Sequence, residues 1–315
     1  MNWGILSRSP ALERKPRGNL AINAGVRVRP LEALNLLTLV VLSVLTLRLD
    51  GRVPDPGGIL KLYALMAAGL ALVMAAVRSE DRLAPALQFA VNFYPMAFIP
   101  LLYESLGPLI LAARPVAQDS LLIAADRALF GKDPTVWLQR FIHPFLTNVF
   151  YIAYVAYYFI AIALGVVLWM RDRAVARRFI FTLSLAYVLS YAGYFAVPAL
   201  GPRAALAASH SVPLETTAVS RAIASTLDRL ENTKFDVFPS GHTMVALVVM
   251  IVAYQRARDA VWWLLPVAVG LVMSTVYCRF HYVVDVIAGT VLAILAVPLG
   301  DRLYDRLEER LKIAD

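Results

Sequence analysis

Long apolar stretches, separated by short polar and basic segments, run through most of the chain. A helix that crosses a membrane needs roughly 20 mainly apolar residues, and eight windows approach that length. These windows are Leu34–Leu49, Ile59–Val77, Ala86–Leu102, Pro144–Met170, Ala176–Val197, Pro239–Tyr254, Val261–Tyr277 and Val283–Gly300. The pattern predicts an all-α protein, a polytopic membrane helical bundle with about eight transmembrane helices.

The two long connections between these windows have patterns of their own. After the third window, Leu109–Leu111 and then Asp126 and Arg127 form a stretch too broken to cross a membrane, so we expect it to lie at the interface. In the second connection, apolar residues recur at helical spacing, which predicts an amphipathic helix on the membrane surface. Those residues are Val219, Ala222, Ile223, Leu227 and Leu230. This helix can be an ordinary interfacial helix or a lid over a site.

The basic residues indicate how the helices are oriented. Cytoplasmic loops collect Lys and Arg, and residues 1–30 are basic but lack the apolar core and cleavage site of a signal peptide. If this segment is a basic cytoplasmic tail, every short basic loop falls on the cytoplasmic side. The basic residues of those loops are Arg78, Arg82, Arg171, Arg173, Arg177, Arg178, Arg256, Arg258, Arg302, Arg306, Arg310 and Lys312. We therefore expect both termini to be cytoplasmic.

The opposite face of the membrane then receives the connections Ser105–His143 and Pro198–Phe238 and the turn Cys278–Tyr282. All four histidines, His143, His210, His242 and His281, fall on this face. It corresponds to the periplasm, the cell exterior or an organelle lumen.

Composition agrees with a membrane protein and excludes other classes. The hydrophobic share of 60% and the mean hydropathy of +0.66 are far above those of a soluble domain. The net charge of +8 comes from clusters between apolar segments rather than from an exposed basic groove, so we expect no nucleic-acid partner. The single cysteine, Cys278, excludes an internal disulfide and offers no thiolate metal site.

A short string at the start of the sixth window carries candidate chemistry: Phe238-Pro239-Ser240-Gly241-His242-Thr243. Pro239 suits the opening turn of a helix, and Ser240 and Gly241 leave backbone N–H groups exposed to a ligand. The positive end of the helix dipole favours an anion there. Phosphate is the anion that this arrangement suits best.

A second string, His281-Tyr282-Val283-Val284-Asp285, opens the eighth window on the same face. His281 and Asp285 are spaced i to i+4, so they share one face of a helix that begins there. Asp285 would then accept from one ring nitrogen and leave the other free as a nucleophile or base, with His242 as the complementary acid. Phosphoryl transfer through a phosphohistidine needs this division of labour. A lone His-x-x-x-Asp is also common in ordinary helix packing, so the inference depends on both strings together.

These two strings resemble the motifs of the type 2 phosphatidic acid phosphatase superfamily of lipid phosphatases and phosphotransferases. The resemblance covers roughly the second half of the chain. It implies that His281 is the nucleophile, Asp285 its orienting partner and His242 the acid and base on the leaving group. Ser240 and Gly241 would contact phosphate, and the reaction would use no metal and no cofactor.

The resemblance also implies a domain organisation. Residues 31–83 would form two extra N-terminal transmembrane helices, and residues 84–303 would form the catalytic membrane domain with its six-helix catalytic core. Residues 304–315 would be a cytoplasmic C-terminal tail.

The chain departs from the family pattern at its cations. The usual first motif pairs a lysine with an Arg-Pro, whereas Pro198–Arg203 at the end of the fifth window has no lysine. The usual third motif places an arginine six residues before the nucleophilic histidine, where this chain has Thr275. Because a phosphoryl transition state needs cations around its oxygens, we expect Arg203 and Arg279, with Lys234, to supply them.

The extra helices ahead of the core and the segment Asp126–Tyr158 resemble the inositol phosphorylceramide synthase branch, an inositolphosphotransferase-like group. Its members transfer a phosphorylated head group from one lipid to the hydroxyl of another. The expected partners are therefore the membrane, a lipid phosphate or phosphodiester substrate, and a lipid hydroxyl acceptor. The same histidine chemistry fits a phosphatidic acid or isoprenyl-phosphate phosphatase. A lipid-phosphate transporter and a non-catalytic binding protein of the same fold are the non-enzyme alternatives.

Overall fold

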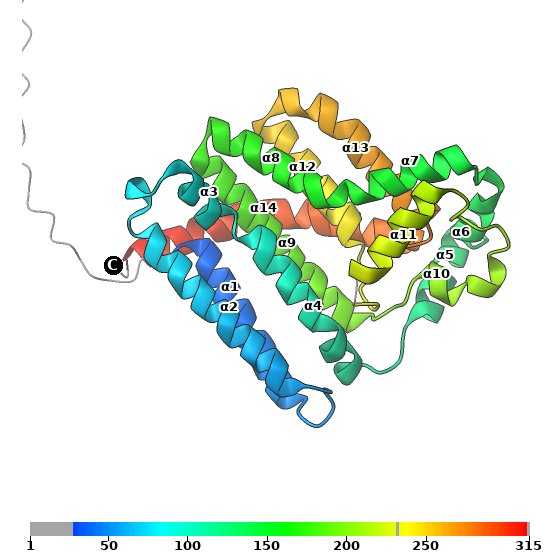
Figure 1. The fold of residues 1–315 in the computed structure, drawn as a ribbon, viewed down its shortest axis with the longest axis horizontal. Coiled ribbons are helices and arrows are strands. Elements are labelled where there is room, and N and C mark those ends of the chain that lie inside the picture. The colour runs from blue at the N-terminus through cyan, green and yellow to red at the C-terminus, as the bar shows by residue number, and fades with distance from the viewer. Residues whose placement is uncertain (1–27, 231–232, 314–315) are drawn as a thin grey trace, which may run out of the picture.

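The computed structural model describes residues 28–230 and 233–313, and all regular structure in these residues is helical. The elements are α1 Pro30–Arg48, α2 Pro56–Val77, η1 Glu80–Arg82, α3 Pro85–Phe93, α4 Pro95–Ala113, α5 Asp119–Phe130, α6 Pro134–Trp137, η2 Leu138–Phe141, α7 Pro144–Val155, α8 Tyr157–Arg171, α9 Arg173–Ala196, α10 Pro202–Ala205, η3 Ala207–Ser209, α11 Ala218–Leu230, α12 Gly241–Arg256, α13 Arg258–Tyr277 and α14 Val283–Ile313. Long helices form a bundle, and the short helices α5, α6 and α10 gather at one end of it (Figure 1). The all-α membrane bundle predicted from the sequence is confirmed.

Six helical segments of the described chain are long and apolar enough to cross a membrane, and α7 with α8, bent by 49°, makes a seventh if the pair is one span. The six are α1, α2, α3 together with α4, α9, α13 and α14. Helix α12, with 16 residues, is shorter than these spans. Each of the eight predicted windows corresponds to one of these helices or helix pairs, and the protein is an integral multi-pass membrane protein.

The third span is longer than the sequence predicted. Helix α4 continues to Ala113, and Leu109 and Ile110 are fully buried within it. The prediction that the stretch Leu109–Leu111 is too broken to continue the third span is therefore wrong, whereas its position at the interface stays a prediction. Polar residues and Pro108 interrupt the apolar run, but Ser105 forms a buried hydrogen bond of 2.8 Å with the Tyr63 hydroxyl and so satisfies its own polar group.

The two segments that the sequence assigned to the interface both contain helices at the same end of the bundle (Figure 1). Helix α5 includes Asp126 and Arg127, and α11 covers the predicted amphipathic segment (Figure 1). At the other end of the chain, α14 continues past residue 303 to Ile313, so most of the predicted C-terminal tail is helical. Most of the predicted basic tail, residues 1–27, lies outside the described residues.

Ion pairs hold several basic loops together at one end of the bundle. Arg29, before α1, donates to Glu32 and to Asn92 of α3. Arg177 of α9 donates to Asn92 and to Glu80 in the connection after α2. The basic segments therefore share one end of the bundle, as the charge pattern predicts. Which side of the membrane this end occupies stays a prediction.

The packed centre of the bundle positions the two histidine strings. Several helices contribute buried side chains to the largest core, among them α9, α12 and α14, whose Phe181, Val248 and Ala293 are fully excluded from solvent. A Cβ atom added at Gly289 of α14 would lie 2.5 Å from the Ser240 carbonyl oxygen. This contact requires glycine, and it fixes the start of α12 against α14.

Candidate active site

His242 and His281 come together where α12 and α14 begin. His242 is the second residue of α12, and His281 lies two residues before α14. The distance from His281 Nε2 to His242 Nδ1 is 3.3 Å. The structure thus joins the two sequence strings in one site.

The His281 ring is buried and held by a backbone acceptor. Its Nδ1 lies 3.0 Å from the Val237 carbonyl oxygen, and because a carbonyl only accepts, Nδ1 carries the proton. In the neutral ring Nε2 is then unprotonated and available for attack. Asp285 Oδ2 lies 3.7 Å from Nδ1, at ion-pair distance, and accepts a hydrogen bond of 2.8 Å from the Tyr282 N–H. Asp285 is therefore near His281 as predicted, but the hydrogen bond that orients the ring goes to Val237.

Two tyrosines contact the His242 ring. Tyr154 lies 4.3 Å and Tyr157 4.1 Å from it, measured between ring centroids. His242 Nε2 is buried and has no hydrogen-bond partner in the structure. Since Nδ1 faces His281, the second nitrogen of His242 is left for another group.

The predicted cations line one cavity with both histidines. This cavity, the cation cavity, has a volume of about 240 Å³ and includes Arg203, Lys234, Arg279, His242 and His281 in its wall. Among the residues that the structure describes, no three His, Cys, Asp or Glu side chains are placed to hold a metal ion. Side-chain cations supply the positive charge of this cavity, which suits a phosphate group.

Arg203 and Arg279 are fixed relative to each other. The Arg203 N–H donates to the Arg279 carbonyl at 2.9 Å, and Arg279 has a positive φ of 64°, an uncommon value for a residue other than glycine. Arg203 Nη2 pairs with Glu215 at 2.8 Å, and Arg279 Nη2 donates to the Val212 carbonyl at 2.6 Å. Arg203 Nη1 and Arg279 Nε are buried without a hydrogen bond, although Arg203 Nη1 lies 3.6 Å from Asp228 Oδ1, at ion-pair distance. Each of these nitrogens can still donate a hydrogen bond to a ligand.

Ser240 and Gly241 are placed differently from the cations. Ser240 is fully buried; its Oγ accepts from the Thr243 N–H at 3.3 Å and its own N–H donates to the Asp285 carbonyl. Ser240 therefore caps α12 and ties it to α14, and it is absent from the wall of the cation cavity. Gly241 lines a different pocket, described below.

Two carboxylates of α5 hold the active-site loops, a role that the sequence did not suggest. Asp126 accepts from the N–H groups of Val283 and Val284 at 3.0 and 2.8 Å, so it caps the first turn of α14. Asp119 accepts from the N–H groups of Leu200 and Gly201 at 2.9 and 2.8 Å, just before Arg203. Both carboxylates are buried, and together they fix the segments that carry His281 and Arg203.

Asp236 is a further polar residue of the cavity that the sequence reading missed. Tyr103 donates a hydrogen bond of 2.5 Å to Asp236 Oδ2. Desolvation raises the pKa of Asp236, and the Tyr103 hydrogen bond and the charge of His281 oppose that shift. Asp236 stands six residues before His242, but nothing in the string itself marks a lone aspartate there as part of the site.

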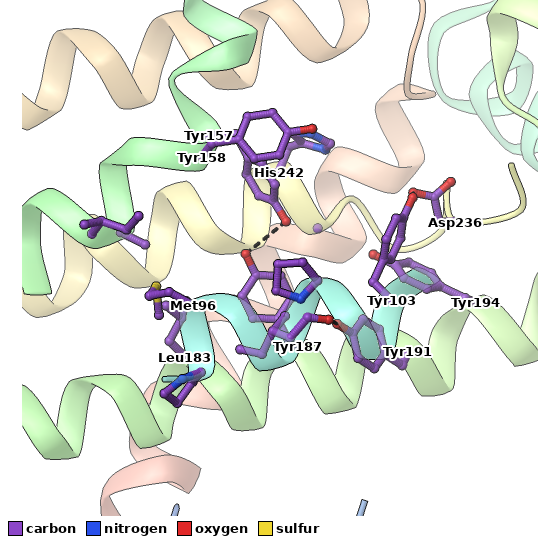
Figure 2. A pocket seen from close by; sticks show the side chains of 16 residues that line it. Met96, Tyr103, Tyr157, Tyr158, Leu183, Tyr187, Tyr191, Tyr194, Asp236 and His242 are labelled. Carbon is purple, nitrogen blue, oxygen red and sulfur yellow. Dashed lines mark hydrogen bonds between the residues drawn. The ribbon is translucent and has the colours of Figure 1, made fainter. Parts of the chain in front are cut away.

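A second cavity lies beside the first. This tyrosine pocket has a volume of about 150 Å³, and Figure 2 shows its side chains around His242. Six tyrosines line it: Tyr103, Tyr157, Tyr158, Tyr187, Tyr191 and Tyr194. The remaining wall is mostly apolar, apart from His242 and Asp236. The pocket is therefore suited to an apolar group with a small polar end.

The fold and the site together define a multi-pass membrane protein with a histidine pair over a cation-lined cavity. A family model described as PAP2 superfamily matches residues 120–299. This match covers more than half of the 315 residues, and the chain belongs to the PAP2 superfamily. Members are generally phosphatases or phosphotransferases, which supports an enzyme of that type. Neither a curated protein nor a solved structure matches the chain in the corresponding comparisons.

Proposed function

We propose that the protein transfers or removes a phosphate-containing group of a membrane lipid through a covalent phosphohistidine on His281. One observation carries this proposal: Nε2 of His281 lies 3.3 Å from His242, in a cavity that Arg203, Lys234 and Arg279 also line. A nucleophile, an acid and three cations are the groups that phosphoryl transfer needs.

In the first step, His281 Nε2 attacks phosphorus while Nδ1 stays bonded to the Val237 carbonyl. An N–P bond forms, the bond to the leaving oxygen breaks, and protonated His242 gives that oxygen its proton. Arg203 Nη1 and Arg279 Nε, which make no hydrogen bond within the protein, would donate to the phosphate oxygens whose charge grows in the transition state. Asp285, at 3.7 Å, faces the ring that becomes positively charged.

In the second step, an oxygen nucleophile attacks phosphorus and gives its proton to His242, and the N–P bond breaks. Water gives hydrolysis, whereas a lipid hydroxyl gives head-group transfer. We favour transfer of the inositol phosphorylceramide synthase type, because a mostly apolar pocket that shares His242 offers room for a lipid alcohol. Hydrolysis of phosphatidic acid or an isoprenyl phosphate is the alternative.

The test gives the purified protein phosphatidylinositol, phosphatidic acid and ceramide together and follows free phosphate and new phospholipids. His281→Ala should lower turnover by at least about 10⁴-fold, since the nucleophile is lost. His143→Asn is the matched control, because His143 lies outside the cation cavity and accepts from the Phe145 N–H at 3.3 Å as an N-cap, which Asn can also do. If both variants keep the wild-type rate, the phosphohistidine mechanism is wrong.

We also propose that the site faces the exterior, the periplasm or a lumen, with both termini cytoplasmic, as the charge pattern predicts. Exposed positions at the two ends of the bundle allow a test: Ala208→Cys and Glu309→Cys. A membrane-impermeant maleimide added to intact cells should label the first and spare the second. The native Cys278 is buried and gives little background. The opposite labelling pattern would invert the proposed topology.

A further inference from the structure

The cation cavity and the tyrosine pocket meet at two residues. Comparison of their walls shows that His242 and Asp236 line both, whereas His281 and the three cations line the cation cavity alone. In Figure 2, Met96 and Leu183 lie at one end of the tyrosine pocket, and Tyr103, Tyr194 and Asp236 lie at the other. The polar end of the pocket is therefore the end that borders the reacting phosphate site.

The two cavities select different parts of a substrate. In the cation cavity, the positive charges of Arg203, Lys234 and Arg279 favour a phosphate group. The tyrosine pocket has no lysine or arginine in its wall, and a phosphate there would lose its water without gaining a cation. An uncharged hydrocarbon with a hydroxyl group fits that pocket better.

The rim of the tyrosine pocket is open to the surface of membrane helices. Tyr158 and Ile162 of α8 are 39% and 37% exposed, and Pro100 of α4 is also exposed. A hydrocarbon can therefore reach the pocket from the lipid side. A cavity of about 150 Å³ holds a group of roughly benzene size, so it admits the hydroxyl-bearing end of a lipid and leaves the chains in the bilayer.

The geometry points to the tyrosine pocket as the alcohol site of the reaction, where Asp236 accepts a hydrogen bond from the hydroxyl of a lipid alcohol and holds it beside His242. This inference rests on the proposed function and names the second substrate of the site as an uncharged lipid alcohol. In an in-line displacement the departing alcohol and the incoming alcohol approach phosphorus from the same side, opposite His281, so both use this pocket in turn.

The atoms balance in each direction. The departing alkoxide takes a proton from His242, becomes an alcohol and leaves the pocket. The incoming alcohol forms a new O–P bond, gives its proton to His242, and the electron pair of the N–P bond returns to His281 Nε2. Asp236 accepts the hydrogen bond while the alcohol is bound, and the O–H group turns from Asp236 to His242 before its proton moves, so Asp236 takes up no proton.

The first test narrows the pocket from its rim with Ile162→Trp. The larger ring should lower the transfer of labelled phosphoinositol from phosphatidylinositol to ceramide by tenfold or more and raise the KM for ceramide. Hydrolysis of acetyl phosphate, whose acetate leaving group is smaller than the benzene-sized space of the pocket, should fall much less than the transfer to ceramide. Phe159→Trp is the matched control, because Phe159 is 64% exposed on the same helix and lies outside the pocket wall.

The second test asks whether Asp236 acts on the alcohol. With phosphatidylinositol labelled in its head group, Asp236→Asn should slow both the labelling of His281 and the passage of the label to ceramide by about tenfold, because the departing and the incoming alcohol use this pocket in turn. Phosphate release from acetyl phosphate, which has no alcohol to hold, should fall by much less. A merely structural role would slow the acetyl phosphate reaction as much, and Asp236→Glu should restore part of the transfer rate.

The outcomes separate this inference from the proposed function. If Ile162→Trp leaves transfer to ceramide unchanged, or slows acetyl phosphate hydrolysis as much, the pocket is not an alcohol site, while the phosphohistidine stands. If Asp236→Asn slows the acetyl phosphate reaction as much as the reactions of phosphatidylinositol and ceramide, the assignment of Asp236 is also overturned. If wild type never labels on His281 with any of these probes, the proposed function itself fails.

Discussion

Replacing Asp126 by Asn tests whether α5 fixes the nucleophile from a distance. Asp126 accepts two backbone N–H groups, those of Val283 and Val284, with its two carboxylate oxygens. An amide keeps one oxygen and turns an N–H₂ group toward the other backbone donor. One buried N–H therefore loses its acceptor at the start of α14, two residues after His281.

The size of the effect follows from this loss. A hydrogen bond to a charged group contributes about 1.5–3 kcal/mol. Desolvation raises the pKa of Asp126 more than the two amide hydrogen bonds lower it, so the cost of Asp126→Asn comes mainly from the buried N–H group that is left without an acceptor. We therefore expect Asp126→Asn to destabilise the start of α14 by about 2 kcal/mol. If this whole amount opposes the active position of His281, turnover decreases roughly 30-fold.

The assay measures kcat and the thermal unfolding midpoint of Asp126→Asn in detergent. The matched control is Asp133→Asn, which removes the ion pair with Arg127, a side chain that is 56% exposed. Such an exposed pair contributes about 0–1 kcal/mol, so the control should keep both kcat and the midpoint near wild type. The reasoning is refuted if Asp126→Asn behaves like this control.

Two further predictions concern packing and pH. Gly289→Ala should lower the free energy of unfolding by about 1–3 kcal/mol, because its Cβ would lie 2.5 Å from the Ser240 carbonyl oxygen. The control Gly69→Ala should leave it unchanged, because a Cβ there has no atom within 4 Å, and thermal unfolding of the two variants compares them. Burial and the charge of Arg279 lower the pKa of His210 to about 4, so stability present above about pH 6.5 is lost as the pH falls toward 4. His210→Gln should reduce this loss of stability by about 1 kcal/mol or less, since His210 is partly exposed. Unfolding at pH 7 and pH 5 measures the difference. A pH dependence equal to that of wild type would contradict a role for His210 in it.

The helices could be predicted because the membrane imposes their length. A spanning helix must satisfy its own backbone groups over an apolar run, and this constraint is visible along the chain. The third span was cut short because local hydropathy does not show that Ser105 would find Tyr63, which lies 42 residues earlier in the chain. A polar residue that is paired across helices looks the same in the sequence as one that ends a helix.

The histidine pair and its cations were predictable for a different reason. His242 and His281 each lie at the start of a helix, where neighbouring residues form a recognisable string. Arg203 and Arg279 were inferred from the need for positive charge rather than from a motif, and the structure places both in the wall of the cation cavity. The carboxylates of α5 could not be found this way. Asp126 binds amides 157 and 158 residues further along the chain, and an isolated aspartate in an interfacial helix looks like a solvated surface residue.

The acceptor of the His281 hydrogen bond could not be predicted either, because it is a backbone carbonyl and any residue at position 237 provides one. Its presence separates two tasks that the sequence assigned to Asp285 alone. Val237 fixes the tautomer and the ring plane at 3.0 Å, whatever the charge of the ring. Asp285, buried at 3.7 Å, matters most when the ring carries positive charge, which happens once Nε2 is bonded to phosphorus. We therefore expect loss of the Asp285 charge to affect the formation of the phosphohistidine more than the orientation of the free histidine.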